Sequence, residues 1–264
     1  MFKTTAPAAG LAAAALSPAF AAVAPFTETY DGGVFTVETP TVEAGSNAVL
    51  TLENDALTIS VPGSTRTGIT VDVPAAAPTT NLKVTQSIDF TFTAVEESIS
   101  RFGFVFAASP ATAAGEGPAD ALYAYLREPA NFRTPNFEIA GFDSDTGFID
   151  DDPDVDDVFS ALAANTAYSL TAAATFLSED DILVEMTLAD TNGTLGSYSY
   201  TVQDVDADEG AITGTAYGLY IRNFDAGSTI VVDDYTLTTQ VVPEPASLAL
   251  LSVVGGALIA RRRR

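Results

Sequence analysis

The sequence contains no cysteine, no histidine and no tryptophan. Without cysteine, the chain cannot form a disulfide, a thiolate zinc site, an iron–sulfur cluster or a cysteine nucleophile. Without histidine, it can hold neither a Ser-His-Asp triad nor an imidazole metal ligand. The absence of tryptophan removes the usual sugar-stacking side chain, although tyrosine and phenylalanine can replace it.

Basic residues are scarce. The 264-residue chain has 11 lysines and arginines against 35 aspartates and glutamates, which gives a formal net charge of −24. Nucleic-acid binding depends on neutralising phosphates with basic side chains. A nucleic acid is therefore not an expected partner.

The first 24 residues contain no acidic residue and have the layout of a secretory signal peptide. Lys3 supplies a positive charge, and Gly10–Leu16 is an apolar run that is followed by small residues. Two A-x-A sites are present, ending at Ala21 and Ala24. Cleavage after Ala24 would place a proline directly after the cut, where its ring fits a protease poorly. Cleavage after Ala21 is therefore favoured, which makes residues 1–21 the signal peptide.

The other end of the chain resembles a membrane stop. Ala246–Ala260 is uncharged and mostly apolar. Fifteen helical residues at about 1.5 Å each span about 22 Å, so insertion needs arginine snorkelling and local thinning of a hydrocarbon core of roughly 30 Å. By the positive-inside rule, the basic cluster that follows stays in the cytoplasm and the body lies across the membrane. That cluster consists of Arg261, Arg262, Arg263 and Arg264.

A proline-rich motif precedes this apolar segment. Pro243, Glu244 and Pro245 hold the chain extended, as a tether that a processing enzyme can grip. The motif, the short hydrophobic helix and the terminal arginines together resemble the PEP-CTERM sorting signal of exported proteins of Gram-negative bacteria. The resemblance covers residues 241–264. It implies recognition by a membrane-embedded exosortase, removal of the tail, and delivery to the cell surface or the exopolysaccharide matrix.

Residues 22–240 form the body, which has six basic and 34 acidic residues and a formal charge of −28. Period-2 alternation of apolar and polar residues dominates it. We expect an all-β fold, a two-sheet antiparallel β-sandwich of the jelly-roll type with about a dozen strands. A hairpin is predicted across Asn192-Gly193, in the turn Asp190-Thr191-Asn192-Gly193. The clearest predicted strands are Ile88–Thr93, Arg101–Phe106, Tyr168–Phe176, Ile182–Leu188, Tyr198–Val202, Tyr217–Ile221 and Thr229–Thr239.

Four segments carry a resemblance in pattern to concanavalin A-like, or laminin-G-like, sandwiches. These segments are Tyr168–Phe176, Ile182–Asp190, Tyr217–Phe224 and Val231–Leu237. The resemblance implies the fold and leaves the function open, because one fold hosts many functions.

One short helix is predicted in the body. Asp152 can cap it, Pro153 suits its first position, and Asn165 is a left-handed stop. Apolar residues recur between them at helical spacing. They are Val155, Val158, Phe159 and Leu162.

The acidic run from Asp143 to Asp157 is the candidate metal site. Calcium takes six to eight oxygen ligands, which alternating aspartates around a glycine turn can supply. The run resembles the calcium loops of thrombospondin type 3 repeats, but Gly147 arrives one residue early and the third carboxylate of their motif is absent. The alternative is a set of solvated charges at a helix N-terminus. The candidate ligands are Asp143, Asp145, Asp150, Asp152 and Asp154.

Several acidic residues of the body are candidates for chemistry on sugars. Glycosidases need two carboxylates flanking the scissile bond. Glu179, Asp181, Glu185, Glu96 and Glu97 form no E-x-D-x-x-E arrangement, so surface carboxylates are the preferred interpretation.

The body's few arginines allow two interpretations. They can pair with aspartate or glutamate, or they can bind an anionic sugar, and salt bridging is the favoured interpretation. The arginines concerned are Arg127, Arg133 and Arg222.

Three functions remain open at this stage. The first is a non-enzymatic, exosortase-processed surface or matrix protein, membrane-anchored at first and with possible partners among exopolysaccharides. The second is a carbohydrate-active enzyme on the same scaffold. The third is a calcium-dependent adhesin or lectin.

Overall fold

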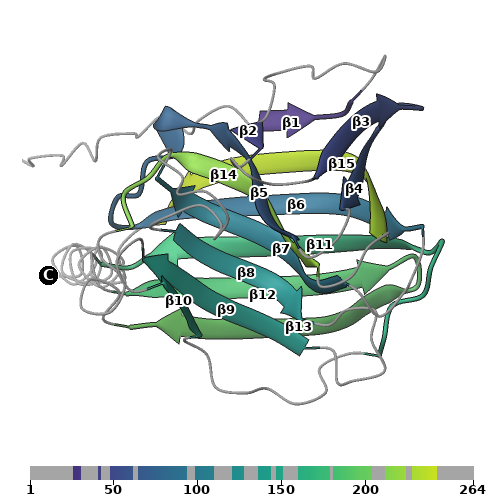
Figure 1. The fold of residues 1–264 in the computed structure, drawn as a ribbon. Helices are drawn as coiled ribbons and strands as arrows, with labels where there is room; N and C mark the ends of the chain where they lie inside the picture. Colours follow the sequence, from purple (N-terminus) through teal and green to yellow (C-terminus); the bar gives the residue numbers. More distant parts are fainter. Residues whose placement is uncertain are drawn as a thin grey trace, which may run out of the picture.

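The computed structural model describes residues 26–30, 41–42, 48–61, 65–93, 99–109, 121–127, 136–143, 147–150, 160–178, 181–203, 212–223 and 228–242. Within these ranges the chain forms fifteen strands in two antiparallel sheets, stacked as two layers (Figure 1). The predicted all-β sandwich is therefore confirmed. The predicted signal peptide, the sorting motif and the C-terminal apolar segment lie outside the described residues. Inside them, no helix has the length and apolar character needed to cross a membrane.

The first sheet has eight strands. Its central strands are long and alternate buried and exposed residues, because one face packs on the other sheet and one faces outward. Their order is β13 (Gly193–Val202), β12 (Ile182–Asp190), β11 (Ala167–Phe176), β6 (Leu82–Phe92), β15 (Ser228–Val241), β4 (Ala56–Val61) and β3 (Val49–Glu53), and β1 (Phe26–Glu28) pairs with β15.

The second sheet has seven strands. Residues on both of its faces are buried in the middle strands, which read as nearly continuous apolar runs. Their order is β10 (Gly147–Asp150), β9 (Asn136–Asp143), β8 (Ala121–Arg127), β7 (Ile99–Ala108), β14 (Ala216–Asn223), β5 (Thr65–Asp72) and β2 (Thr41–Val42).

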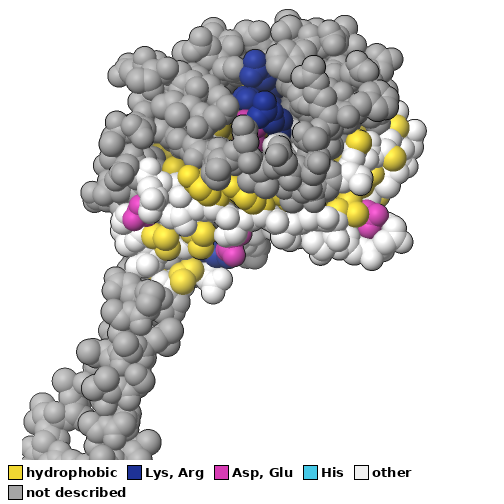
Figure 2. All heavy atoms as spheres, turned by 90° about the horizontal axis from the view of Figure 1, so that it is seen from below, with side chains coloured by type: hydrophobic (Ala, Val, Ile, Leu, Met, Phe, Trp, Pro, Cys, Tyr) yellow, Lys and Arg dark blue, Asp and Glu magenta, His cyan; other side chains and the backbone are white. Residues whose placement is uncertain are grey.

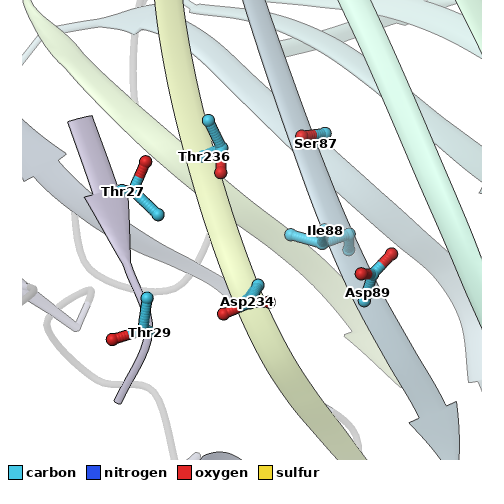
Figure 3. A pocket seen from close by; sticks show the side chains of 7 residues that line it. All are labelled: Thr27, Thr29, Ser87, Ile88, Asp89, Asp234 and Thr236. Carbon is cyan, nitrogen blue, oxygen red and sulfur yellow. The ribbon is translucent and has the colours of Figure 1, made fainter. Parts of the chain in front are cut away.

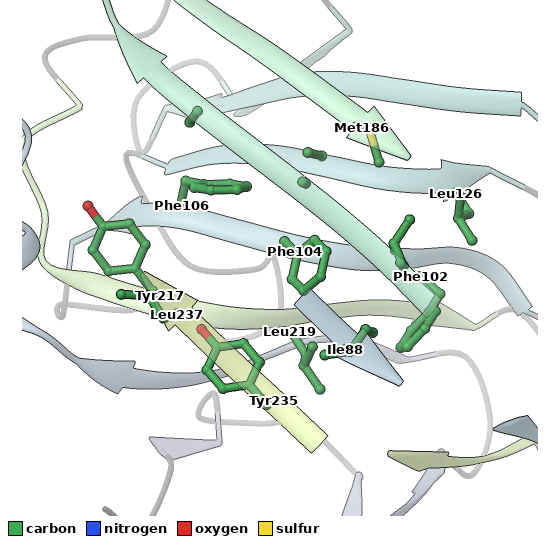
Figure 4. Close-up of a cluster of buried hydrophobic side chains, with 14 of the residues drawn as sticks. Ile88, Phe102, Phe104, Phe106, Leu126, Met186, Tyr217, Leu219, Tyr235 and Leu237 are labelled. Carbon is green, nitrogen blue, oxygen red and sulfur yellow. The ribbon is translucent and has the colours of Figure 1, made fainter. Parts of the chain in front are cut away.

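Aromatic side chains join the two sheets. Phe102 of β7 packs against Phe90 and Phe92 of β6, with ring centroids 4.9 and 5.7 Å apart, and all three are fully buried. Figure 4 shows Phe102, Phe104 and Phe106 of β7 among side chains of the opposite sheet. Burial of one such side chain stabilises the fold by roughly 1.5–3 kcal/mol, so this cluster is a main source of inter-sheet cohesion.

One polar side chain also crosses the core. Gln86 of β6 is fully buried, and its Nε2 donates to the carbonyl oxygen of Val105 in β7 at 2.9 Å. The hydroxyl of Tyr235 donates to Oε1 of Gln86 at 2.6 Å. The buried amide is thus paired on both sides, which fixes the register of the two sheets locally.

All seven strands predicted from alternation are confirmed, and so is the hairpin between β12 and β13. Its two turn residues are Thr191 and Asn192, and Gly193 begins β13 with a φ of 135°. The predicted four-residue turn Asp190-Thr191-Asn192-Gly193 is therefore confirmed, whereas its central pair is Thr191-Asn192 rather than Asn192-Gly193.

The helix predicted from Asp152 to Asn165 is wrong over its second half. Residues 160–165 carry no helix, and residues 151–159 lie outside the described ranges. Leu162 is buried without one, and Asn165 has the expected left-handed φ of 55° while its N–H donates to the carbonyl of Phe92 at 2.8 Å. Leu162 is therefore buried, and the backbone N–H of Asn165 is hydrogen-bonded, without a helix in this segment. The helical turn among the described residues is instead Pro74–Ala76.

Candidate functional site

A pocket of about 190 Å³ lies on the outer face of the eight-stranded sheet, where β1, β15 and β6 run side by side (Figure 3). We call it the threonine pocket. Its lining combines hydroxyl groups and carboxylates with one apolar residue. The lining residues are Thr27, Thr29, Ser87, Ile88, Asp89, Asp234 and Thr236.

Strand register explains why these residues meet. Thr27 of β1 is directly opposite Thr236 of β15, which is in turn opposite Ser87 of β6. One step further along, Asp234 is opposite Asp89. Residues two apart on a strand share a face, so hydroxyls and carboxylates form a grid on the outer surface.

The hydroxyls of the pocket belong to a longer row. From Ser87 the register continues through β11, β12 and β13, and each position is a serine or threonine that is at least partly exposed. We call this set the hydroxyl row. It consists of Thr27, Thr236, Ser87, Thr171, Thr187 and Ser197.

A β-bulge brings a third carboxyl beside the pocket. The register of β15 with β6 shifts between Val232 and Asp234, which leaves Asp233 as the extra residue. Burial, and then the charge of Asp89, raise the pKa of the Asp233 carboxyl above its ordinary value. Negative charge is therefore concentrated at this point of the sheet.

The floor of the pocket is rigid. Tyr235, between the two lining residues of β15, points into the core, where its hydroxyl is bound to Gln86. Beside it, the backbone N–H of Tyr30 donates to the buried Glu28 carboxylate at 3.2 Å. Burial raises the pKa of the Tyr30 hydroxyl, and the charges of Glu28 and Asp234 raise it further, so Tyr30 stays neutral.

The lining residues of the pocket can both donate and accept hydrogen bonds. Carboxylates accept, whereas serine and threonine hydroxyls donate and accept. Such a set complements a ligand that carries several hydroxyl groups. The volume is below the 300–1,000 Å³ of drug-sized pockets, which suits one small ring rather than a long ligand.

The candidate calcium run is divided by a hairpin. Asp143 ends β9 opposite Gly147, whereas Asp150 ends β10 opposite Ala140, three rungs or about 10 Å along the strands. Asp145, Asp152 and Asp154 lie outside the described residues. Across the ranges that the structure describes, no three acidic side chains are placed to hold a metal ion. Calcium binding by this run stays a prediction, which isothermal titration with calcium would test.

The other charged residues singled out from the sequence lie elsewhere. Glu185 pairs with Lys83 at 2.6 Å on the eight-stranded sheet, outside the pocket. Arg127 of β8 forms an ion pair with Glu138 at 3.1 Å, which confirms the salt bridging predicted for it. Arg222 lies on β14, two strands from β8 in the same sheet. Glu96, Glu97, Arg133 and Glu179, the sorting residues Pro243, Glu244 and Pro245, and the arginines Arg261 to Arg264 lie outside the described residues.

Sequence reasoning missed the threonine pocket. Its residues come from three segments far apart in the chain, and only the sheet order brings β1, β15 and β6 together. A partial signal was present, since Asp89, Asp233 and Asp234 are acidic positions within predicted strands that are otherwise rich in threonine.

No protein-family model and no curated protein sequence matches the chain. Among solved structures, peanut lectin with a 9mer peptide is similar, with a TM-score of 0.51 and 8% identity over 83% of this chain and 98% of the lectin. Lectin II from Ulex europaeus has a TM-score of 0.50 and 10% identity over 82% of this chain and 98% of its own. At such identities the likeness shows the fold alone: the chain folds as a two-sheet antiparallel sandwich similar to those of these two lectins.

Proposed function

We propose that this chain is an exported, non-enzymatic protein of the cell surface or exopolysaccharide matrix that binds a neutral sugar unit in the threonine pocket. The observation that carries the proposal is the pocket itself. Six of its seven lining residues have hydroxyl or carboxylate groups. The names of the two similar structures, both lectins, support sugar binding as the use of this fold.

The charge of the pocket favours a neutral sugar. Asp89 and Asp234 stand opposite each other, and like charges directly opposite are destabilising. An anionic sugar would add to this repulsion. A neutral sugar offers hydroxyl donors to the carboxylates instead, and hydrogen bonds to charged groups are worth about 1.5–3 kcal/mol.

Glycan binding is tested with the purified full-length chain in detergent on an array of neutral oligosaccharides, followed by calorimetry on the best binder. Asp234→Asn and Thr236→Val should lower the affinity roughly tenfold or more, because each removes a hydrogen-bonding group of the pocket. Thr187→Val is the matched control, because Thr187 belongs to the same hydroxyl row but lies outside the pocket. Absence of any binder, or an equal loss in Thr187→Val, would refute the proposal.

Export and sorting form the second part of the proposal. The N-terminal signal, the Pro243-Glu244-Pro245 motif and the terminal arginines support an exosortase and the membrane as partners. Replacement of Pro243, Glu244 and Pro245 by alanine should leave the C-terminal tail attached. Intact mass spectrometry of the exported protein reads this directly, and unchanged processing would contradict the assignment.

A carbohydrate-active enzyme is the second candidate, and one observation favours it. Asp89 and Asp234 lie directly opposite on neighbouring strands, which holds their Cβ atoms about 5 Å apart. Retaining glycosidases hold their two carboxyl groups at about 5–5.5 Å. Release of reducing ends from a bound glycan, abolished in Asp89→Asn, would establish the enzyme and refute the non-enzymatic proposal.

A further inference from the structure

The turn of the β12–β13 hairpin carries a sequence pattern that the pocket and the core do not use. Asn192 is followed by Gly193 and Thr194, which matches the N-x-S/T acceptor pattern of N-linked glycosylation. Of the eight asparagines in the chain, Asn192 alone has a serine or threonine two positions later. Because so short a pattern also arises by chance, the structure around Asn192 decides whether it can act as an acceptor.

The hairpin turn is open to solvent. Thr191 and Asn192 form the turn, and every residue from Thr191 to Leu195 is exposed. A Cβ atom placed on Gly193 would have no heavy atom within 4 Å beyond its chain neighbours. N-linked glycosylation adds a bulky group to a surface segment, so it needs space of this kind. The described residues therefore leave room for an oligosaccharide on Asn192.

Asp190 holds the turn from its base and keeps the amide of Asn192 at the surface. Its Oδ1 accepts a hydrogen bond from the backbone N–H of Asn192 at 2.7 Å, and its Oδ2 accepts one from Nδ2 of the same residue at 3.2 Å. The second hydrogen bond is exposed, so water or an enzyme can replace it at a small net cost. The nitrogen atom that glycosylation would use is thus oriented by the turn and remains accessible.

The tip of the hairpin can open without disturbing the core. A glycosylating enzyme must bind the acceptor segment in its own active site, which requires such an opening. A β-bulge leaves Leu195 as the extra residue of β13 and separates the tip from the rest of the hairpin. Leu188, on the core side of the bulge, is fully buried, whereas no residue from Ala189 to Leu195 is buried. Opening of the tip therefore exposes no core side chain and costs little free energy.

β13 is the last strand of the eight-stranded sheet in the described part of the chain, with β12 as its neighbour. It contains no charged residue and no proline. Such residues commonly protect the edge of a sheet, because an unprotected edge can pair with another chain. Figure 2 views the molecule from the side on which β13 lies in Figure 1, and its described surface shows few charged groups. An oligosaccharide at the start of β13 would shield this edge from association.

We propose that Asn192 carries an N-linked oligosaccharide. The donor is an oligosaccharide bound to a polyprenyl diphosphate, and the transfer takes place in the active site of a membrane oligosaccharyltransferase. Nδ2 of Asn192 attacks the anomeric carbon of the donor and forms a C–N bond, while the bond between that carbon and the diphosphate oxygen breaks. The diphosphate leaves with the bonding electron pair, and Nδ2 gives one proton to a base of the enzyme. The exposed hydroxyl of Thr194 can form a hydrogen bond to the enzyme.

Glycosylation of Asn192 requires export, so it rests on that part of the proposed function, but it does not depend on the threonine pocket. Thr194 shares a rung with Asp89 and lies three strands away from it, or about 14 Å. An oligosaccharide on Asn192 therefore leaves the lining residues of the pocket in place. Asn192→Gln should keep the affinity for a neutral glycan.

The test is peptide mass spectrometry of the chain, purified in detergent from the cells that make it. We expect Asn192 to carry additional mass that corresponds to whole sugar residues. Asn192→Gln and Thr194→Ala should abolish the modification, because the first removes the acceptor side chain and the second removes the hydroxyl of the pattern. Thr194→Ser should retain it, because it keeps the hydroxyl. Circular dichroism and thermal melting establish that each variant is folded.

Asn54 is the matched control within the same chain. It is exposed in the turn of the β3–β4 hairpin, as Asn192 is in its own turn, but Ala56 stands where the hydroxyl residue would be. Asn54 should therefore carry no sugar. Equal modification of Asn54, retention of the sugar in Thr194→Ala, or an unmodified Asn192 in a chain that has lost residues 1–21 would each overturn the inference.

Failed export gives a different result, because the chain would then retain residues 1–21. In that case the wild-type chain and its variants are treated in detergent with a purified bacterial oligosaccharyltransferase and an undecaprenyl diphosphate-linked oligosaccharide. Transfer to Asn192 that requires the hydroxyl of Thr194 supports the acceptor site, and absence of transfer to Asn192 overturns it.

Discussion

Asp233 illustrates how a single carboxyl group stores unfavourable energy beside the threonine pocket. Burial and the nearby charge of Asp89 raise its pKa, so the folded state binds the proton more readily than the unfolded state does. Linkage then requires that the fold loses stability as pH rises through the raised pKa and regains it as pH falls. At neutral pH the ionised side chain is therefore a cost, and the bulge keeps it in place.

Asp233→Asn should stabilise the protein at neutral pH by about a few tenths of a kcal/mol, because solvent screens the charge of this exposed side chain. Urea unfolding at neutral and at acidic pH measures this. The advantage of the variant should shrink as pH falls, because the wild-type carboxyl becomes protonated. Asp89→Asn should act in the same direction, and the double variant should gain less than the sum. A variant that is less stable than wild type at neutral pH would contradict this account.

At the scale of elements, the β12–β13 hairpin depends on one side chain. Oδ1 of Asp190 accepts hydrogen bonds from the backbone N–H groups of Asn192 at 2.7 Å and Gly193 at 3.1 Å. Chiefly the bond from the Asn192 N–H holds the pKa of the Asp190 carboxyl below its ordinary value. The contribution of this carboxylate to stability is present at neutral pH and is lost as pH falls through the lowered pKa.

Asp190→Ala should therefore lower the thermal midpoint at neutral pH, and the gap to wild type should narrow under strongly acidic conditions. Asp190→Asn serves as the control, because its amide oxygen still accepts hydrogen bonds and does not titrate in this range. At neutral pH the thermal midpoint of Asp190→Asn should lie between those of wild type and Asp190→Ala. If the difference in midpoint between wild type and Asp190→Ala is the same at every pH, the turn does not depend on the charge of Asp190.

Elements were predictable where side chains alternate. The sequence of β6 alternates from Leu82 to Phe92, and so do its burial values, because one face meets the core. The β3–β4 hairpin was missed, although Asn54 and Asp55 between the strands, with φ of 55° and 59°, are residues that tolerate such a turn. The helix prediction over residues 160–165 was wrong because Leu162 fits a helical spacing by chance. Leu162 is buried in the core although its segment is not helical.

The threonine pocket could not be predicted from the sequence, for a reason of topology. Thr27, Ser87 and Thr236 become neighbours only through the order β1, β15, β6. Arg101 and Arg222 likewise meet only because β14 returns beside β7 after crossing between the sheets. Periodicity identifies the strands and their outer faces but carries no information on which strands pair. Arg222 was singled out from the sequence, whereas its position opposite Arg101 follows from the sheet order.

At the scale of the whole molecule, the two sheets share one core behind the threonine pocket. Asp89 on β6 is exposed, while its neighbour Phe90 meets Phe102 of β7 in the core with ring centroids 4.9 Å apart. The pocket is therefore supported by the aromatic cluster that joins the two sheets. A change in that cluster should lower stability and glycan binding together, whereas a change in the pocket lining should lower glycan binding alone.

Phe102→Ala should cost about 3–5 kcal/mol, a large share of the 5–15 kcal/mol that typical domains possess. Phe102→Leu should cost less, because it fills more of the space. Urea unfolding measures both losses, and the binding of neutral glycan should disappear along the Phe102→Ala unfolding transition. Asp234→Asn should weaken glycan binding without a comparable loss of stability. Persistence of glycan binding at a urea concentration where Phe102→Ala has unfolded would mean that the threonine pocket does not depend on the core that the two sheets share.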